Sequence, residues 1–124
     1  MALSKVYLVR NKVVQALEFL EKVVKLDPGN TDAFYNLGIV YYNSEDFENA
    51  KRFFRRAIEI SNHLNSFLYL AYISEQEGNK EDAISYLRKR IHYKTGFDDE
   101  FAEEARKHLY KLIHEDSTTG ASHD

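Results

Sequence analysis

Histidines, carboxylates and a short basic run are the residues of this chain that could carry chemistry, so their spacing is the first evidence about function. The five histidines are His63, His92, His108, His114 and His123. No two of them are four residues apart, and the chain contains no cysteine. Zinc sites need such ligand spacings, so the sequence predicts no metal site, and ordinary helix and loop positions explain all five histidines.

Two acidic clusters, Asp98-Asp99-Glu100 and Glu103-Glu104, have the composition of the paired carboxylates used in acid–base catalysis. Adjacent residues of a helix point about 100° apart, so these neighbouring side chains do not face one substrate. The sequence also has no glycine-rich phosphate loop and no nucleophile elbow. We therefore interpret the clusters as a solvated helix surface, and we expect neither an enzyme nor a cofactor.

One basic run has tyrosines beside it and could contact nucleic acid. It consists of Arg88, Lys89, Arg90, His92 and Lys94, with Tyr86 and Tyr93 nearby. The whole chain has a formal net charge of −3, which gives no general attraction to nucleic acid or to an anionic membrane. No apolar run approaches the roughly 18 residues that span a bilayer, and no secretory signal pattern opens the chain. We expect a cytoplasmic protein whose partner is not a nucleic acid.

Residues 31–60 show which elements would position these side chains. Phe34, Leu37 and Tyr41 recur at helical spacing after potential N-capping residues, which predicts an inner helix over about 31–43. Residues 44–46 favour a turn, after which a second apolar stripe predicts an outer helix. Its residues are Phe47, Ala50, Phe54, Ala57 and Ile58. Gly38 lies mid-helix, where glycine costs about 1 kcal/mol relative to alanine, so we expect two helices to approach closely there.

The same pattern occurs three times along the chain. Ala16 precedes Ala50 by 34 residues, and Ala83 follows it by 33. In the first copy, Leu3-Ser4 and Tyr7 match Leu37-Gly38 and Tyr41. We call such matched positions slots. The aromatic, Leu-Gly, Tyr, Ala, Phe pattern resembles the tetratricopeptide repeat (TPR).

This resemblance implies an all-α fold, a right-handed α-solenoid of three TPR-like helix-turn-helix repeats with a C-terminal capping helix. The predicted domain covers residues 1–115, with repeats at about 1–30, 31–63 and 64–97 and the capping helix at 98–115. Residues 116–124 lack apolar periodicity and are expected to form a disordered tail. Arg90 stands where the other repeats have small residues, and we expect it to reach Glu103 or Glu104 on the capping helix.

By analogy with the family, the inner helices should line a concave groove that binds another protein. The expected groove residues are Lys5, Tyr35, Ile39, Tyr42, Asn43, Leu68, Tyr72 and Gln76. Exposed tyrosines anchor apolar peptides or helices, and we expect them to contribute little to folding, although some could simply cover the inner helices. The cationic clamp with which some relatives bind chaperone tails is not expected, because Asn65 and Tyr69 stand where cations would be needed.

Leu8, Val9 and Val14 favour a different function, self-assembly. In the second and third repeats the slots of Val9 and Val14 hold Asn, Gln or Glu, so the first repeat is apolar where the others are polar. The alternative to groove binding is therefore a homo-oligomer formed through the N-terminal repeat. A third interpretation is that the chain is a fragment of a longer repeat array, in which a neighbouring repeat covers this face.

Overall fold

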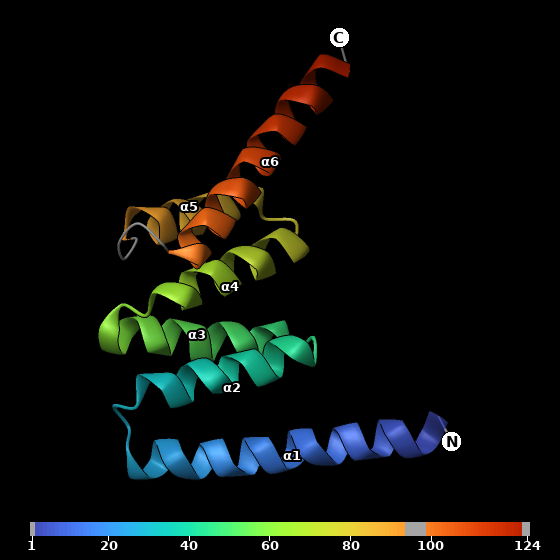
Figure 1. Cartoon of the computed structure of the whole chain (residues 1–124), viewed down its shortest axis with the longest axis vertical. Helices are drawn as coiled ribbons and strands as arrows, with labels where there is room; N and C mark the ends of the chain where they lie inside the picture. The colour runs from blue at the N-terminus through green and yellow to red at the C-terminus, as the bar shows by residue number, and fades with distance from the viewer. Residues whose placement is uncertain (1, 94–98, 123–124) are drawn as a thin grey trace. The chain divides into compact units, whose positions relative to one another are not determined.

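The computed structural model consists of helices grouped into two compact units, Met1–His63 and Leu64–Asp124. It describes the backbone of residues 2–93 and 99–122, and the side chains of residues 10–93 and 99–115. Unit 1 contains α1 (Ala2–Leu26), α2 (Thr31–Asn43) and α3 (Phe47–Ser61). Unit 2 contains α4 (Leu64–Gln76), α5 (Lys80–His92) and α6 (Glu100–Ser122). These described stretches contain no strand (Figure 1), so the all-α prediction is confirmed.

Two helical hairpins, α2–α3 and α4–α5, turn where a residue with positive φ is followed by an N-capping side chain. Glu45 has a φ of 61° and Gly78 a φ of 78°. The side-chain oxygens of Asp46 and Asn79 then accept hydrogen bonds from the amides three residues later, at 3.3 and 3.1 Å. These bonds satisfy amides that have no partner inside the new helix, and so define where α3 and α5 begin.

The first repeat differs from the predicted helix-turn-helix, because α1 is one continuous helix of 25 residues. Lys12 occupies the slot that holds Asp46 and Asn79 in the other repeats. A lysine side chain only donates hydrogen bonds, so it cannot cap the first amides of a following helix. Residues 10–12 also contain no glycine or proline to interrupt the helix. The two predicted helices of the first repeat therefore run on as one.

The bounds of α6 also differ from those of the predicted capping helix. The helix begins at Glu100 and is assigned through Ser122, whereas the sequence predicted residues 98–115. No proline or glycine lies between His114 and Thr119 to end it earlier. The side chains of residues 116–124 lie outside the described part of the chain, so the disordered tail stays a prediction.

Small residues bring α2 and α3 into close contact in unit 1. Leu37, Ala50 and Phe54 are 0% exposed. A Cβ atom added at Gly38 would lie only 2.6 Å from Cε1 of the Phe54 ring. The predicted close approach of the two helices at Gly38 is therefore confirmed, and the space that a side chain would need is filled by an aromatic ring.

We expect Gly38→Leu to lower the free energy of unfolding by about 1–3 kcal/mol or more, because the new side chain overlaps the Phe54 ring. Thermal unfolding followed by circular dichroism measures the effect. Gly29→Leu is the matched control, since nothing lies within 4 Å of a Cβ at Gly29. Equal unfolding midpoints for the two variants would contradict the role of Gly38 in this helix contact.

The core of unit 2 joins all three of its helices. Its buried residues are Leu68, Ala71, Ala83, Leu87, Ala105 and Leu112, from α4, α5 and α6. Tyr72, Ile84 and Leu109 pack against this cluster while remaining partly exposed. Because α6 supplies Ala105 and Leu112, it covers apolar surface of the α4–α5 hairpin, as a capping helix must.

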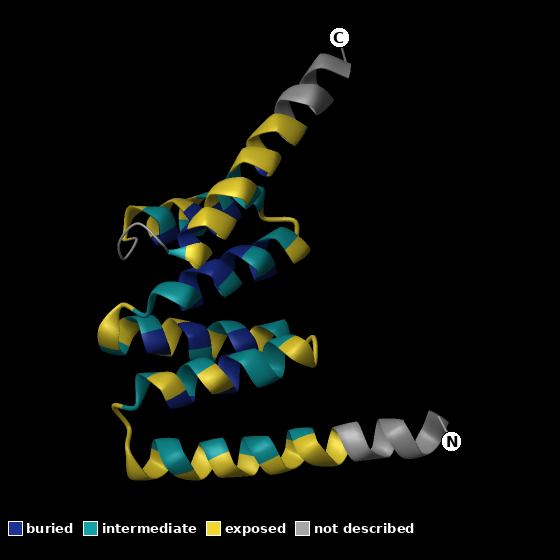
Figure 2. Cartoon of the chain, in the orientation of Figure 1, coloured by how far each residue is buried: buried dark blue, intermediate teal, exposed yellow. Residues whose placement is uncertain are grey.

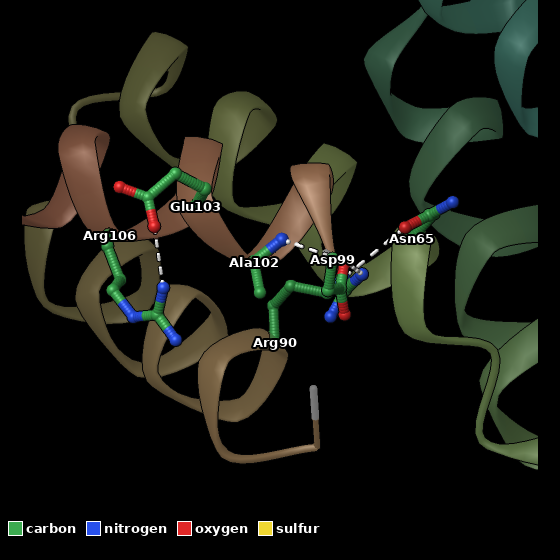
Figure 3. A network of polar contacts seen from close by, with 6 residues as sticks. All are labelled: Asn65, Arg90, Asp99, Ala102, Glu103 and Arg106. Carbon is green, nitrogen blue, oxygen red and sulfur yellow. Dashed lines mark hydrogen bonds and ion pairs between the residues drawn. The ribbon is translucent and has the colours of Figure 1, made fainter. Parts of the chain in front are cut away.

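A buried ion pair joins α5 to the beginning of α6. The guanidinium Nη2 of Arg90 lies 2.6 Å from Oδ1 of Asp99, and the two side chains are 3% and 5% exposed. Arg90 Nε also donates to Oδ1 of Asn65 at 3.3 Å, and Asp99 Oδ1 accepts from the amide of Ala102 (Figure 3). The prediction that Arg90 pairs with Glu103 or Glu104 was wrong, because Asp99, one turn earlier, combines helix capping with the ion pair.

Removing one partner of this pair should be strongly destabilising, because it leaves a buried charge uncompensated. We expect Arg90→Met to cost about 3–5 kcal/mol of unfolding free energy. The double variant Arg90→Met/Asp99→Asn should cost at least about 1 kcal/mol less than the sum of the single variants, since the charges are coupled. Chemical denaturation of the four proteins of this cycle measures the coupling.

The exposed pair between Arg106 and Glu103 is the control for the buried one. Its atoms lie 2.7 Å apart, but the side chains are 43% and 56% exposed. Arg106→Met should therefore cost only about 0–1 kcal/mol. If Arg90→Met cost no more than Arg106→Met, the Arg90–Asp99 pair would not hold α6 in place.

Candidate peptide-binding surface

The predicted groove residues of α2 share one face of that helix. Tyr35, Ile39 and Tyr42 are spaced four and three residues apart, which places their side chains in one row. All three are half-buried, whereas Leu37 and Gly38, on the side facing α3, are buried. Asn43 is exposed at the end of the helix. The row thus presents apolar and aromatic surface that remains partly exposed after α2 packs against α3.

Ring contacts within unit 1 hold the two tyrosines of this row. The Tyr35 ring lies 5.8 Å from the Phe54 ring and 4.4 Å from the His63 imidazole, measured between centroids. The Tyr42 ring lies 5.8 Å from that of Phe47. These contacts restrict the two side chains within unit 1, and they also contribute to packing.

His63 lies under Tyr35 at the end of unit 1, in an environment that favours its neutral form. Burial lowers the pKa of His63, and the Asp32 carboxylate, whose Oδ1 is 4.0 Å from Nε2, opposes this shift only in part. A histidine with a lowered pKa is largely uncharged near pH 7. His63 therefore supplies a flat, neutral ring to the tyrosine and not a positive charge.

The predicted groove residues of α4, described within unit 2 alone, are not equally accessible. Leu68 is 2% exposed and belongs to the hydrophobic core, so it is a packing residue and not part of an open surface. Tyr72 is half-buried, with ring centroids 5.9 Å from Tyr69 and 5.2 Å from His108. Gln76 is exposed. Tyr72 and Gln76 are thus the residues of this face that a partner can reach.

Sequence reasoning missed a polar pair beside Tyr72. The His108 Nε2 of α6 contacts Oε2 of Glu75 on α4, and both side chains remain partly exposed. His108 occupies the slot that holds Tyr41 in the second repeat and Ser74 in the third. Extending the slot comparison into the capping helix would have identified it. The pair adds a carboxylate and an imidazole to an aromatic surface, so a partner's polar group could bind next to its apolar one.

The predicted residues of the N-terminal repeat are only partly described. Lys5, Leu8 and Val9 lie outside the residues whose side chains the structure describes. Val14 is 51% exposed on α1, where Phe19 and Leu26 are also exposed. The described part of α1 therefore presents apolar side chains to solvent.

The basic run on α5 does not form a continuous cationic surface in the described residues. Arg90 is buried in its pair with Asp99. The Lys89 ammonium lies 6.0 and 5.8 Å from the ring centroids of Phe67 and Tyr86, and Lys94 is not described. Cation–π contact and burial thus account for two of the charges that might have faced a nucleic acid.

The described residues contain neither a cluster of metal ligands nor a helix that could cross a membrane. No group of three or more histidine, cysteine or acidic residues lies close enough there to hold a metal ion. No helix in that part of the chain is both long and apolar enough to cross a membrane.

Known proteins share the repeat pattern and the fold. A family model described as "Tetratricopeptide repeat" matches residues 31–63, and one described as "TPR repeat" matches residues 5–45. Protein O-mannosyl-transferase Tmtc3 of Drosophila melanogaster is 31% identical over 75 residues, which are 60% of this chain but only 8% of that protein.

A solved structure extends the similarity to almost the whole chain. The crystal structure of MamA superimposes with a TM-score of 0.64 over 98% of this chain and 78% of that one, at 23% sequence identity. This likeness concerns the fold alone. Both family models and the shared fold agree with the helical hairpins described above, and residues 5–63, which the two models match, belong to the tetratricopeptide repeat family.

Proposed function

We propose that this chain is a non-enzymatic protein-interaction module whose inner helices α2 and α4 bind an apolar peptide or helix of a partner protein. The observation that carries the proposal is the half-exposed row of Tyr35, Ile39 and Tyr42 on α2, opposite a fully packed face. Tyr72 and Gln76 on α4 supply similar chemistry in unit 2.

The chemistry of these faces indicates what kind of segment would bind. Tyrosine contributes a large apolar area together with a hydroxyl that need not be fully buried, which suits a surface that is wet before binding. Ile39 adds a purely apolar contact, while Asn43 and Gln76 offer amide groups near the helix ends. An amphipathic helix or an extended apolar segment matches this pattern, as in helix-in-groove recognition.

A peptide selected from a displayed library of amphipathic segments provides the probe for this proposal. Tyr42→Ala and Tyr72→Ala should each weaken its binding by about 2 kcal/mol, roughly thirtyfold, if these rings are anchors. Each should also cost about 1 kcal/mol of stability, because the rings contact Phe47 and His108. Calorimetric titration and thermal unfolding measure the two effects on the same proteins.

Tyr110→Ala is the control, since Tyr110 is 65% exposed on α6 and belongs to neither face. Its affinity for the peptide should equal that of the parent. Equal affinity of Tyr42→Ala and of Tyr72→Ala would show that these tyrosines are packing residues only, whatever their cost in stability.

A second function, self-assembly through the N-terminal repeat, is favoured by the exposed apolar residues of α1. Val14, Phe19 and Leu26 are 51%, 67% and 88% exposed. Phe19 and Leu26 are seven residues apart, which places them on one face of α1, and an exposed apolar face often marks an interface. Leu8 and Val9 belong to the same prediction, but their side chains lie outside the described residues.

At tens of micromolar, the protein should sediment as a species heavier than the 14.5 kDa of one chain. Val14→Glu should shift it toward the monomer if Val14 itself lies in the contact, because a buried unpaired charge is costly. Analytical ultracentrifugation measures both masses. A parent protein that is monomeric across this concentration range would refute self-assembly and leave peptide binding untouched.

A further inference from the structure

The face of α4 that the core leaves accessible carries a single charge. Seven of the thirteen residues of this helix are buried (Figure 2). The residues of its second half that remain accessible are Tyr69, Tyr72, Glu75 and Gln76. Glu75 is the only charged residue of α4, so its carboxylate sets the charge of this face.

Glu75 lies beside the tyrosine that the proposed function uses as an anchor. Tyr72 is followed by Glu75 and Gln76 after three and four residues, so the three side chains lie on one side of the helix. The Glu75 slot holds Tyr42 in the second repeat and Leu109 in α6. Unit 2 thus has a carboxylate on α4 where other helices have an aromatic or aliphatic side chain.

The contacts of Glu75 use only one of its two carboxylate oxygens. Oε2 contacts Nε2 of His108 on α6, and the His108 ring lies 5.2 Å from that of Tyr72 in an edge-on arrangement. The Glu75 side chain is 36% exposed, and no lysine or arginine of the described residues forms an ion pair with it. His108 therefore orients the carboxylate, while Oε1 remains able to accept a hydrogen bond from a partner.

The charges around this position leave the carboxylate uncancelled. Helical spacing places Glu104 and Lys111 of α6 on either side of His108, and their charges are opposite. Glu77 and Lys80, which follow α4, are also of opposite charge. Glu75 lies in the last turn of α4, where the helix dipole adds partial negative charge and the helix has no basic side chain to oppose it. This end of α4 therefore attracts a cation.

We infer that the partner segment bound at Tyr72 carries a lysine or arginine whose charged group binds Oε1 of Glu75. This inference rests on the proposed peptide binding and specifies the partner's chemistry at one position. A segment that packs on Tyr72 also covers the neighbouring carboxylate and removes it from water. Burying an ionised carboxylate without a donor is costly, so a purely apolar segment binds poorly at this position.

A basic side chain of the partner suits both the ring and the carboxylate. Its methylene stem can pack on the Tyr72 ring while its charged group reaches Glu75. Hydrogen bonds between two charged groups are stronger than those between neutral groups, and an aromatic ring also attracts a cation placed over its face. An acidic side chain at the same position would be repelled by Glu75.

Selection of segments from the displayed library on the full chain is the first test. Segments whose binding is weakened by Tyr72→Ala should share a lysine or arginine at one position among their apolar residues. Segments that depend on Tyr72 but share no basic residue would overturn this inference and leave the proposed function standing. A library that yields no segment dependent on Tyr72 would overturn the inference together with peptide binding by α4.

A mutant cycle between the chain and one selected peptide measures the contact itself. Glu75→Gln removes the charge but keeps an oxygen that can accept a hydrogen bond from His108. It should weaken binding of the basic peptide by about tenfold or more, because a charge-assisted hydrogen bond is lost. The same peptide with its basic residue changed to methionine should bind Glu75→Gln at least as well as it binds the parent. Calorimetric titration of the four combinations measures the coupling, and an equal loss for both peptides would overturn the inference.

Glu77→Gln is the matched control, because it removes the same charge from an exposed residue just beyond the end of α4. Its affinity for the basic peptide should stay within about twofold of the parent at physiological salt, which screens charges that do not touch the ligand. Circular dichroism should show the helix content of the parent in both variants, so that a loss of affinity reports the contact and not unfolding. Equal losses of affinity for Glu75→Gln and Glu77→Gln would overturn the inference, since the general charge of unit 2 would then explain the binding.

Discussion

The hairpin turns of this chain depend on one kind of hydrogen bond. A backbone amide in the first turn of a helix donates it to the side chain of the residue just before that helix. Asp46 and Asn79 accept that bond, and each begins the second helix of a hairpin. Lys12, in the same slot, cannot accept it, and α1 continues. Such a cap contributes only about 1 kcal/mol. A helix that continues instead keeps all of its backbone hydrogen bonds, so this small difference is enough to change the connectivity.

The packing of each unit follows from where the hairpins form. In α2–α3 the turn brings Gly38 against Phe54, and the slots around this contact are 0% exposed. In α4–α5 the same slots are filled by Ala71 and Leu87, and α6 completes the core. In α1 the apolar residues are present but no second helix of the repeat lies beside them. The exposed Phe19 is therefore a consequence of a missing cap nearly two helical turns earlier in the sequence.

Periodicity predicted the helices of the second and third repeats and the contact at Gly38, because both depend on residues close in sequence. It failed where distant residues decide the outcome. Leu68 shares a slot with the half-exposed Tyr35 but is buried with Ala105 and Leu112 of α6, more than 35 residues away. The partner of Arg90 was missed because α6 begins at Glu100, which makes Asp99 its capping residue. An exact helix boundary is what sequence patterns define least well.

The tyrosines of the proposed binding faces show that packing and recognition need not be separate roles. Immobilising a free side chain on binding costs about 0.5–1.5 kcal/mol. The Tyr42 ring contacts Phe47, and the Tyr72 ring contacts Tyr69 and His108. Part of the loss of side-chain freedom therefore occurs on folding and not on binding. A fixed half-exposed ring can therefore bind more tightly than a mobile, fully exposed one. Such a ring packs against the protein on one side and is exposed on the other. A loss of stability when the tyrosine is truncated therefore does not by itself argue against a binding role.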